Sequence, residues 1–209
     1  MKVIGLCGRS GSGKGVVSAV FSELGVPSVD TDAVYHELTA PSADGNGSDC
    51  MRELAAEFGE GIRRPDGGLD RRALAAVVFS DRDKLAALNR ITHKHILDET
   101  DRRLDGFRHD GYGEAIVDAP LLFESGYDKK CDFIIAADAP EDTLLRRIAA
   151  RDGISIDEAA KRLSSQITSD VLRSRADFVI YTDTDVDTIR RCAERILEDI
   201  RGREAKANG

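Results

Sequence analysis

Short apolar runs alternate with amphipathic stretches along most of this 209-residue chain. The runs are rich in Val and Ile and lack period-two alternation, which is typical of strands buried on both faces of a parallel sheet. Five such strands are predicted, at residues 2–7, 26–30, 114–119, 132–137 and 177–181. Helical periodicity between them, clearest at 16–24 and 186–200, predicts an α/β doubly wound fold.

The stretch between the second and third predicted strands departs from this alternation. Residues 31–113 contain no convincing strand, and their helical patterns lie at 49–58, 70–79 and 81–105. So long a stretch exceeds the single helix that usually connects two parallel strands. We therefore predict a helical insertion at 31–113, within a core formed by residues 1–30 and 114–209.

Charge and cysteine content narrow the class of protein. Lys and Arg number 30 against 38 Asp and Glu, a net charge of −8 that disfavours a general nucleic-acid binder. The longest apolar run, 73–79, is far shorter than the roughly 20 residues that span a bilayer. The four cysteines lack zinc or redox spacing, and Cys7, Cys131 and Cys192 fit core positions. We expect a cytoplasmic protein without a membrane or nucleic-acid partner, and the oligomeric state stays open.

The first predicted strand leads into a glycine-rich loop that ends at a lysine. Gly8, Gly11, Gly13 and Lys14 give the spacing G-x4-G-K, directly before a predicted helix. In a P-loop, backbone N–H groups surround the phosphates and the lysine reaches the β and γ oxygens. The alternative is a strand–helix turn without a ligand, but the lysine and its context favour nucleotide binding.

The residue after the lysine breaks the P-loop pattern. A Ser or Thr there normally places a hydroxyl on Mg²⁺, whereas this chain has Gly15 followed by Val16. The sequence therefore predicts phosphate binding by this loop without a direct hydroxyl ligand for the metal.

Carboxylates follow two of the predicted strands. Asp30 and Asp32 come at the end of the second strand, and Asp118 ends the third. The carboxyl ends of parallel strands face the ligand crevice, where a carboxylate can orient a nucleophile or hold Mg²⁺ through water. The alternative is that these residues cap helices or turns.

A basic segment lies near the end of an otherwise acidic chain. Residues 144–175 hold seven Lys and Arg against four Asp and Glu, and Ser155 with Glu158 predicts a helix start inside it. Such a segment fits a helical lid that neutralises phosphates, although a solvated helical face would look the same. His93 and His95 lie two residues apart, which on a helix does not form a metal site.

Several further stretches follow the P-loop in order along most of the chain: L-D-R-x-x-L at 69–74, L-N-x-I-T-H at 88–93 and P-L-L-F-E at 120–124. Arg151-Asp152, Gln166 and residues 173–180 continue the series. Together these stretches resemble the dephospho-CoA kinase family, which has a P-loop fold like that of nucleoside-monophosphate kinases. Three positions depart from the family pattern: Gly15 with Val16, Lys94, and the segment 181–183.

The resemblance implies a five-stranded parallel core, a helical insertion that binds the CoA substrate and a helical lid. It implies transfer of the γ-phosphoryl group of ATP, with Mg²⁺, to the ribose 3′-hydroxyl of dephospho-CoA. Asp32 and Lys14 would be catalytic, with Asp32 accepting the hydroxyl proton, and Asp32 and Asp118 would hold the metal through water. Implied ATP-binding residues are Gly8, Gly11, Ser12, Gly13, Lys14, Gly15, Val16, Arg147 and Arg151. Implied substrate-binding residues are Asp32, Arg71, His93 and Leu121.

Two other functions stay open at this point. The chain could be a P-loop kinase acting on another small metabolite or nucleotide. It could also be a nucleotide-binding protein with little catalysis, an alternative that the missing hydroxyl at Gly15 supports.

Overall fold

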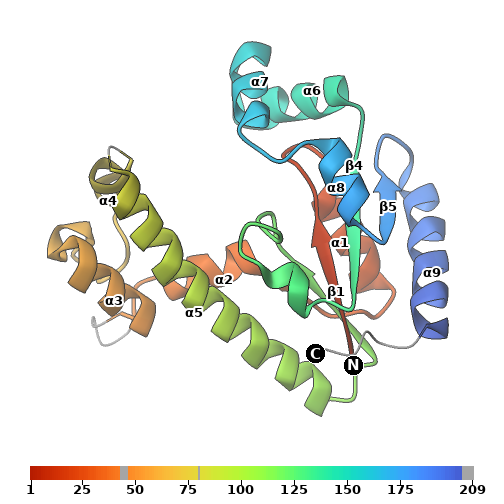
Figure 1. Cartoon of the computed structure of the whole chain (residues 1–209), viewed down its shortest axis with the longest axis horizontal. Helices are drawn as coiled ribbons and strands as arrows, with labels where there is room; N and C mark the ends of the chain where they lie inside the picture. The colour runs from red at the N-terminus through yellow and green to blue at the C-terminus, as the bar shows by residue number, and fades with distance from the viewer. Residues whose placement is uncertain (43–46, 80, 204–209) are drawn as a thin grey trace. The chain divides into compact units, whose positions relative to one another are not determined.

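The computed structural model describes residues 1–42, 47–79 and 81–203, and these form a five-stranded parallel sheet (Figure 1). The strands are β1 (Lys2–Cys7), β2 (Ser28–Asp30), β3 (Glu114–Asp118), β4 (Phe133–Asp138) and β5 (Phe178–Tyr181). Their order in the sheet is β2-β3-β1-β4-β5. The predicted fold class is therefore confirmed. Only β2 is clearly shorter than expected, because it starts after Pro27, which has no N–H for a ladder.

The main core lies between the sheet and two helices. Val17, Val20 and Phe21 of α1 (Lys14–Glu23) join Ile4 and Ile135 of the central strands in one buried cluster. Helix α9 (Val186–Gly202) packs against α1 and adds its periodic apolar face to the same cluster. This packing fixes α1, and with it the loop between β1 and α1.

The strand order decides where a ligand can bind. From β1 the chain crosses to β2 at the edge of the sheet and returns to β3 beside β1, and it then passes β1 to reach β4 on the other side. The direction of the connections therefore reverses next to β1. In open parallel sheets the ligand crevice lies at such a switch point, beyond the carboxyl ends of the strands. The glycine-rich loop begins at that end of β1.

Three helices connect β4 to β5 over the segment predicted as a lid. They are α6 (Glu141–Asp152), α7 (Ile156–Ser164) and α8 (Ser169–Arg175). Helices α6 and α7 pack side by side around Leu144, Ile148 and Leu163 (Figure 1). The capping box that opens α7 is confirmed, because the Ser155 hydroxyl accepts from the Glu158 N–H and the Glu158 carboxylate accepts from the Ser155 N–H.

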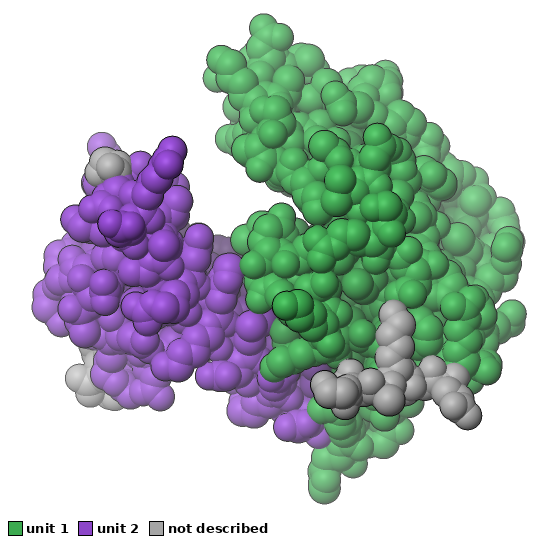
Figure 2. Space-filling model, viewed as in Figure 1, with its two compact units in different colours: residues 1–29, 106–209 green, residues 30–105 purple. Residues whose placement is uncertain are grey.

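The chain divides into two compact units, residues 1–29 with 106–209 and residues 30–105 (Figure 2). The described part of the second unit contains α2 (Thr31–Leu38), α3 (Asp49–Phe58), a 3-10 turn (Glu60–Ile62), α4 (Arg71–Val78) and most of α5 (Arg82–His109). It has a core of its own around Met51, Leu54 and Ile91.

Helix α5 is one turn longer than the sequence predicts. It continues through Gly106 to His109, and the Phe107 ring meets Tyr112 edge-on with centroids 5.8 Å apart. Gly111, whose φ is +84°, then turns the chain toward β3. The helix thus continues past a glycine, which lowers local helix propensity, and a local ring contact follows at its end.

No helix among the described residues is long and apolar enough to cross a membrane. The predicted core cysteines pack as expected, since Cys7 and Cys131 are buried and Cys192 packs against the main cluster. Burial raises the pKa of the Cys7 thiol to about 12, so this residue stays a protonated core side chain beside the loop.

Candidate active site

The loop between β1 and α1 has backbone positions that only glycine fits well. A Cβ at Gly8 would lie 2.7 Å from the carbonyl oxygen of Ala137, so β4 requires a glycine there. Gly11 has φ +78°, and a Cβ on it would lie 2.6 Å from the Leu144 carbonyl oxygen of α6. The loop is thus held tightly between β4 and α6. Helix α1 starts at Lys14, and the first N–H groups of a helix lack intrahelical acceptors and can bind an anion. In the described residues the Val16 N–H already donates to the Gly13 carbonyl at 2.9 Å.

Lys14 forms an ion pair with Asp118 at the end of β3. Both side chains are largely buried, with 18% and 6% of their surface exposed. The lysine ammonium therefore lies at the carboxyl edge of the sheet, beside the one predicted metal-site carboxylate that belongs to the same unit.

Gly15 differs from the other loop glycines. It is exposed, its φ is not positive, and a Cβ placed on it would meet no atom within 4 Å. Val16 is also exposed, at 42%. Neither residue has a side-chain oxygen, whereas the Ser12 hydroxyl is buried and has no hydrogen-bond partner among the described residues.

Arg147 of α6 reaches the loop. Its guanidinium donates to the Gly11 carbonyl at 3.2 Å, to the Thr182 hydroxyl at 2.9 Å and to the Thr182 carbonyl at 2.7 Å. The Thr182 hydroxyl in turn donates to the Ser12 carbonyl at 2.5 Å. Within the part of the chain that the structure describes, these partners are all neutral. The positive charge of Arg147 is thus placed beside the loop without a carboxylate to neutralise it.

The other arginines of the lid segment have acidic partners. Arg151 pairs with Asp152 at 2.7 Å, and Arg162 pairs with the same carboxylate. The Arg151 guanidinium lowers the pKa of Asp152, which therefore stays ionised. Arg151 and Arg147 thus lie on the same helix, but only Arg147 contacts the loop.

Two loop residues that the sequence analysis did not single out also bind the lid segment. Arg9 is buried and donates to the Leu163 carbonyl of α7 at 2.9 Å. The Ser10 N–H donates to the Gln166 side-chain oxygen at 2.9 Å. These contacts join residues about 155 positions apart, so no local pattern in the sequence reveals them. The one signal for them was the presence of Gln166 in the family resemblance.

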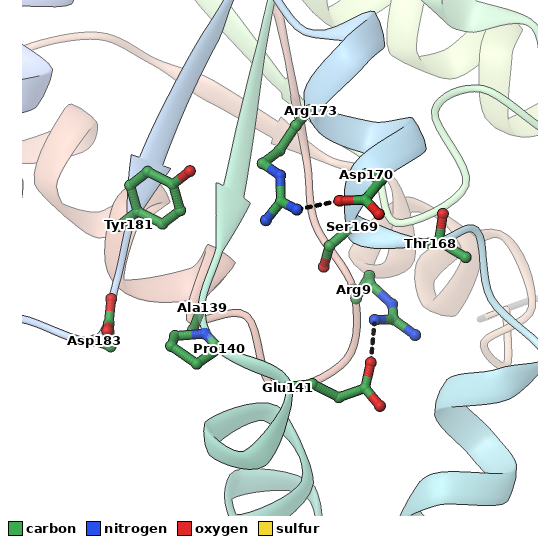
Figure 3. A pocket seen from close by; sticks show the side chains of 10 residues that line it. All are labelled: Arg9, Ala139, Pro140, Glu141, Thr168, Ser169, Asp170, Arg173, Tyr181 and Asp183. Carbon is green, nitrogen blue, oxygen red and sulfur yellow. Dashed lines mark hydrogen bonds and ion pairs between the residues drawn. The ribbon is translucent and has the colours of Figure 1, made fainter.

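A cavity of about 610 Å³ lies beside the loop, at the carboxyl ends of β4 and β5 (Figure 3). Arg9, Pro140, Arg173 and Tyr181 form much of its wall. Two of the lining residues bond the buried Asp138 carboxylate, which accepts from Arg173 at 2.7 Å and from the Ser169 hydroxyl at 2.8 Å. The sequence analysis missed Asp138, although it follows the same rule as Asp118: a carboxylate at the end of a buried strand.

Asp32, Arg71 and His93 belong to the second unit. Asp30 caps α2 by accepting from the N–H groups of residues 32 and 33, so the helix-cap interpretation holds for that carboxylate. Asp32 itself is exposed in the first turn of α2, and its carboxylate has no hydrogen bond or ion pair within the described residues. The two carboxylates of this segment therefore differ, because Asp30 is used in the helix cap and Asp32 is not.

Arg71, in the first turn of α4, bonds His36 and stacks near the Tyr35 ring at 5.8 Å. Arg71 and His36 both line a cavity of about 450 Å³ within this unit. His93 is half-buried on α5, and the neighbouring His95 binds Glu53 at 2.7 Å. Leu121 belongs to the first unit, where it is 53% exposed just after β3.

The model of the dephospho-CoA kinase family matches residues 2–188. The chain belongs to the dephospho-CoA kinase family. It is 39% identical over 202 residues to the dephospho-CoA kinase of Moorella thermoacetica, and this alignment covers 96% of the chain and 92% of that protein.

Solved structures show the same fold. The Thermus thermophilus protein TT1252 superposes with a TM-score of 0.78 and 30% identity, over 95% of this chain and 97% of that one. The dephospho-CoA kinase from Campylobacter jejuni has a TM-score of 0.69 over 97% and 99% of the two chains, and at 24% identity it supports the fold. Of the functions left open by the sequence, a kinase for a different metabolite is not favoured.

Proposed function

We propose that this chain transfers the γ-phosphoryl group of ATP to the ribose 3′-hydroxyl of dephospho-CoA, giving coenzyme A and ADP. The observation that carries the proposal is the family match over residues 2–188, which spans the second compact unit and most of the first. A phosphoryl transfer of this kind needs positioned phosphates, positive charge around them and a base for the attacking hydroxyl.

The first unit supplies groups suited to ATP. The loop from Gly8 to Val16 would bind the phosphates through its N–H groups, with Ser12 and Gly13 inside the cradle. Lys14 would exchange its contact with Asp118 for the phosphate oxygens. Arg147 would add the charge that no carboxylate neutralises, and Arg151 would have to leave Asp152 to join it.

The residues at this edge fit Mg²⁺ bound mainly through phosphate oxygens and water. Mg²⁺ keeps several waters and often takes only one or two protein ligands. With no hydroxyl at residues 15 and 16, the Asp118 carboxylate would hold it from the outer sphere, and the family resemblance implies the same role for Asp32. When bound, the ion would neutralise charge on the β and γ phosphates.

The second unit would bind dephospho-CoA. Its basic cavity residue Arg71 and the half-buried His93 are suited to the anionic groups of this substrate, and Leu121 of the first unit to its apolar parts. Asp32 would accept the proton of the 3′-hydroxyl, since its carboxylate is unpaired. The four free cysteines fit a reducing compartment, so we place the reaction in the cytoplasm.

A CoA-forming assay with ATP, Mg²⁺ and dephospho-CoA tests the proposed function. We expect turnover with dephospho-CoA in clear preference to nucleoside monophosphates. Binding of ATP without turnover on either acceptor would instead support the nucleotide-binding alternative that Gly15 raised.

Replacing the proposed base separates chemistry from binding. Asp32→Asn is expected to lower kcat by roughly 10²- to 10⁴-fold, with the Kd for ATP unchanged in calorimetry. Asp187→Asn is the matched control, because Asp187 is also an exposed carboxylate in a first helical turn, that of α9. Near-normal turnover by Asp32→Asn would remove Asp32 from the mechanism.

A further inference from the structure

The end of helix α7 is bonded to the beginning of the phosphate loop by a closed ring of hydrogen bonds. The Leu163 carbonyl accepts from the Gln166 N–H at 3.2 Å and from the Arg9 guanidinium at 2.9 Å. The Gln166 side chain then returns to Ser10, the residue after Arg9. Two segments far apart in the sequence thus hold each other without any ligand.

Gln166 uses both ends of its amide in this contact. Its oxygen accepts from the Ser10 backbone N–H at 2.9 Å, and its nitrogen donates to the Ser10 hydroxyl at 2.8 Å. This pairing fixes the position of residue 10 and the direction of its N–H. Residues 11–14, which follow at once, contain the positive-φ glycines and the lysine.

The Gln166 side chain does not point into solvent as that of an ordinary surface glutamine does. Gln166 lies just beyond the end of α7 at Ser164, where a side chain is free to point into solvent. It is instead half-buried and joined to the loop by two hydrogen bonds. Among the described residues, the side chain of its neighbour Ser165 makes a local contact alone, donating to the Arg162 carbonyl at 2.8 Å.

We propose that Gln166 is a positioning residue of the nucleotide site, which holds the phosphate loop in its binding conformation through Ser10 and ties it to the lid segment. The inference rests on the proposed function only in taking ATP as the nucleotide. Without the clamp, the loop must be ordered by ATP itself, so nucleotide affinity falls while the acceptor site is unaffected.

The test replaces the amide by a side chain of similar length that cannot form either bond. Gln166→Met is expected to raise the Kd for ATP roughly tenfold, because two hydrogen bonds of ordinary strength are lost. The KM for dephospho-CoA should stay unchanged. Calorimetry with ATP in the absence of dephospho-CoA measures the first quantity without turnover.

Two further variants make the result specific. Ser165→Ala is the matched control in the same turn and should bind ATP like the wild type. Ser10→Ala removes only the hydroxyl contact and should weaken ATP binding less than Gln166→Met does. In the double variant the Ser10 substitution should cost little more, because its partner is already gone.

The outcomes are separable. Unchanged ATP affinity in Gln166→Met would overturn the positioning proposal while leaving the kinase function in place. Equal losses for ATP and dephospho-CoA would also overturn it, since they indicate general loss of structure. If Gln166→Met does not fold by circular dichroism, Ser10→Ala carries the test, and unchanged ATP affinity there would contradict the proposal. Failure of the wild type to form CoA would instead refute the proposed function.

Discussion

Gly15 is the residue at which this chain departs from the usual P-loop, and its surroundings decide what a substitution there would do. It needs neither a positive φ nor the space left by a missing side chain. Its glycine is thus not required by the fold, unlike Gly8 and Gly11. The missing hydroxyl is therefore a difference in chemistry at the metal position, which a substitution can restore.

Gly15→Ser is expected to lower the Mg²⁺ concentration needed for half-maximal rate, because it returns a hydroxyl ligand to the position after the lysine. The variant should also be more stable by about 0.5 kcal/mol, since serine costs less than glycine in a helix. A Mg²⁺ titration of activity for both proteins measures the first effect. Superimposable titration curves at intact activity would show that residue 15 does not govern the metal.

Residues that join distant segments were the hardest to predict. Lys14 and Gly11 carry a local signal, a glycine pattern with a required backbone conformation. Thr182 and Arg9 carry none, because they act through bonds to residues more than 150 positions away. Thr182 even stands where the sequence departs from the family pattern, yet it connects Arg147 to the loop.

At the scale of elements, the predicted helix boundaries agree with the structure where a side chain caps the helix. Helix α3 starts and ends as the pattern predicts, and α7 begins at its capping box. The buried strands were equally clear, because runs of Val and Ile in a parallel sheet need no tertiary information to be noticed. The prediction ended helix α5 at residue 105, because an apolar periodicity does not reveal the contact between Phe107 and Tyr112.

Helix α5 also contains a charge cluster whose contribution to the stability of the fold depends on pH. Glu99 accepts from Arg102 at 2.7 Å and from Arg103 at 2.8 Å. These bonds lower the pKa of Glu99 from 4.5 to about 2. Because the folded pKa lies below the unfolded one, the stabilisation is present at neutral pH and is lost as the pH falls from about 4.5 toward 2.

Glu99→Gln is therefore expected to lower the free energy of unfolding by about 1 kcal/mol at pH 7, because its partner Arg102 is 72% exposed and solvent screens the ion pair. The difference from the wild type should shrink as the pH falls below 4.5. Urea unfolding at a series of pH values measures this. Glu198→Gln, at an exposed position of α9, serves as the control. A difference that does not change with pH would contradict the assignment of the effect to the Glu99 charge.

At the scale of the whole molecule, the chain has two separate hydrophobic cores, one in each unit. We propose that the two units bind different ligands. The core of the second unit includes Leu54, which is fully buried among Met51, Ile62 and Ile91. The core of the first unit includes Ile135 of β4, which is also fully buried. Neither cluster shares a residue with the other, so each core can be weakened separately.

Leu54→Ala should destabilise the second unit by roughly 2–5 kcal/mol, the usual cost of a cavity left by a buried leucine. If that unit binds dephospho-CoA, the KM for dephospho-CoA rises as its folded population falls, while the Kd for ATP stays near that of the wild type. Ile135→Ala is the matched substitution in the first unit, below the phosphate loop, and should weaken ATP binding instead. Calorimetry with ATP and steady-state kinetics with dephospho-CoA, both run as a function of temperature, compare the two variants. Parallel loss of both ligands in Leu54→Ala would mean that the units unfold together, and the division of binding between them would have to be abandoned.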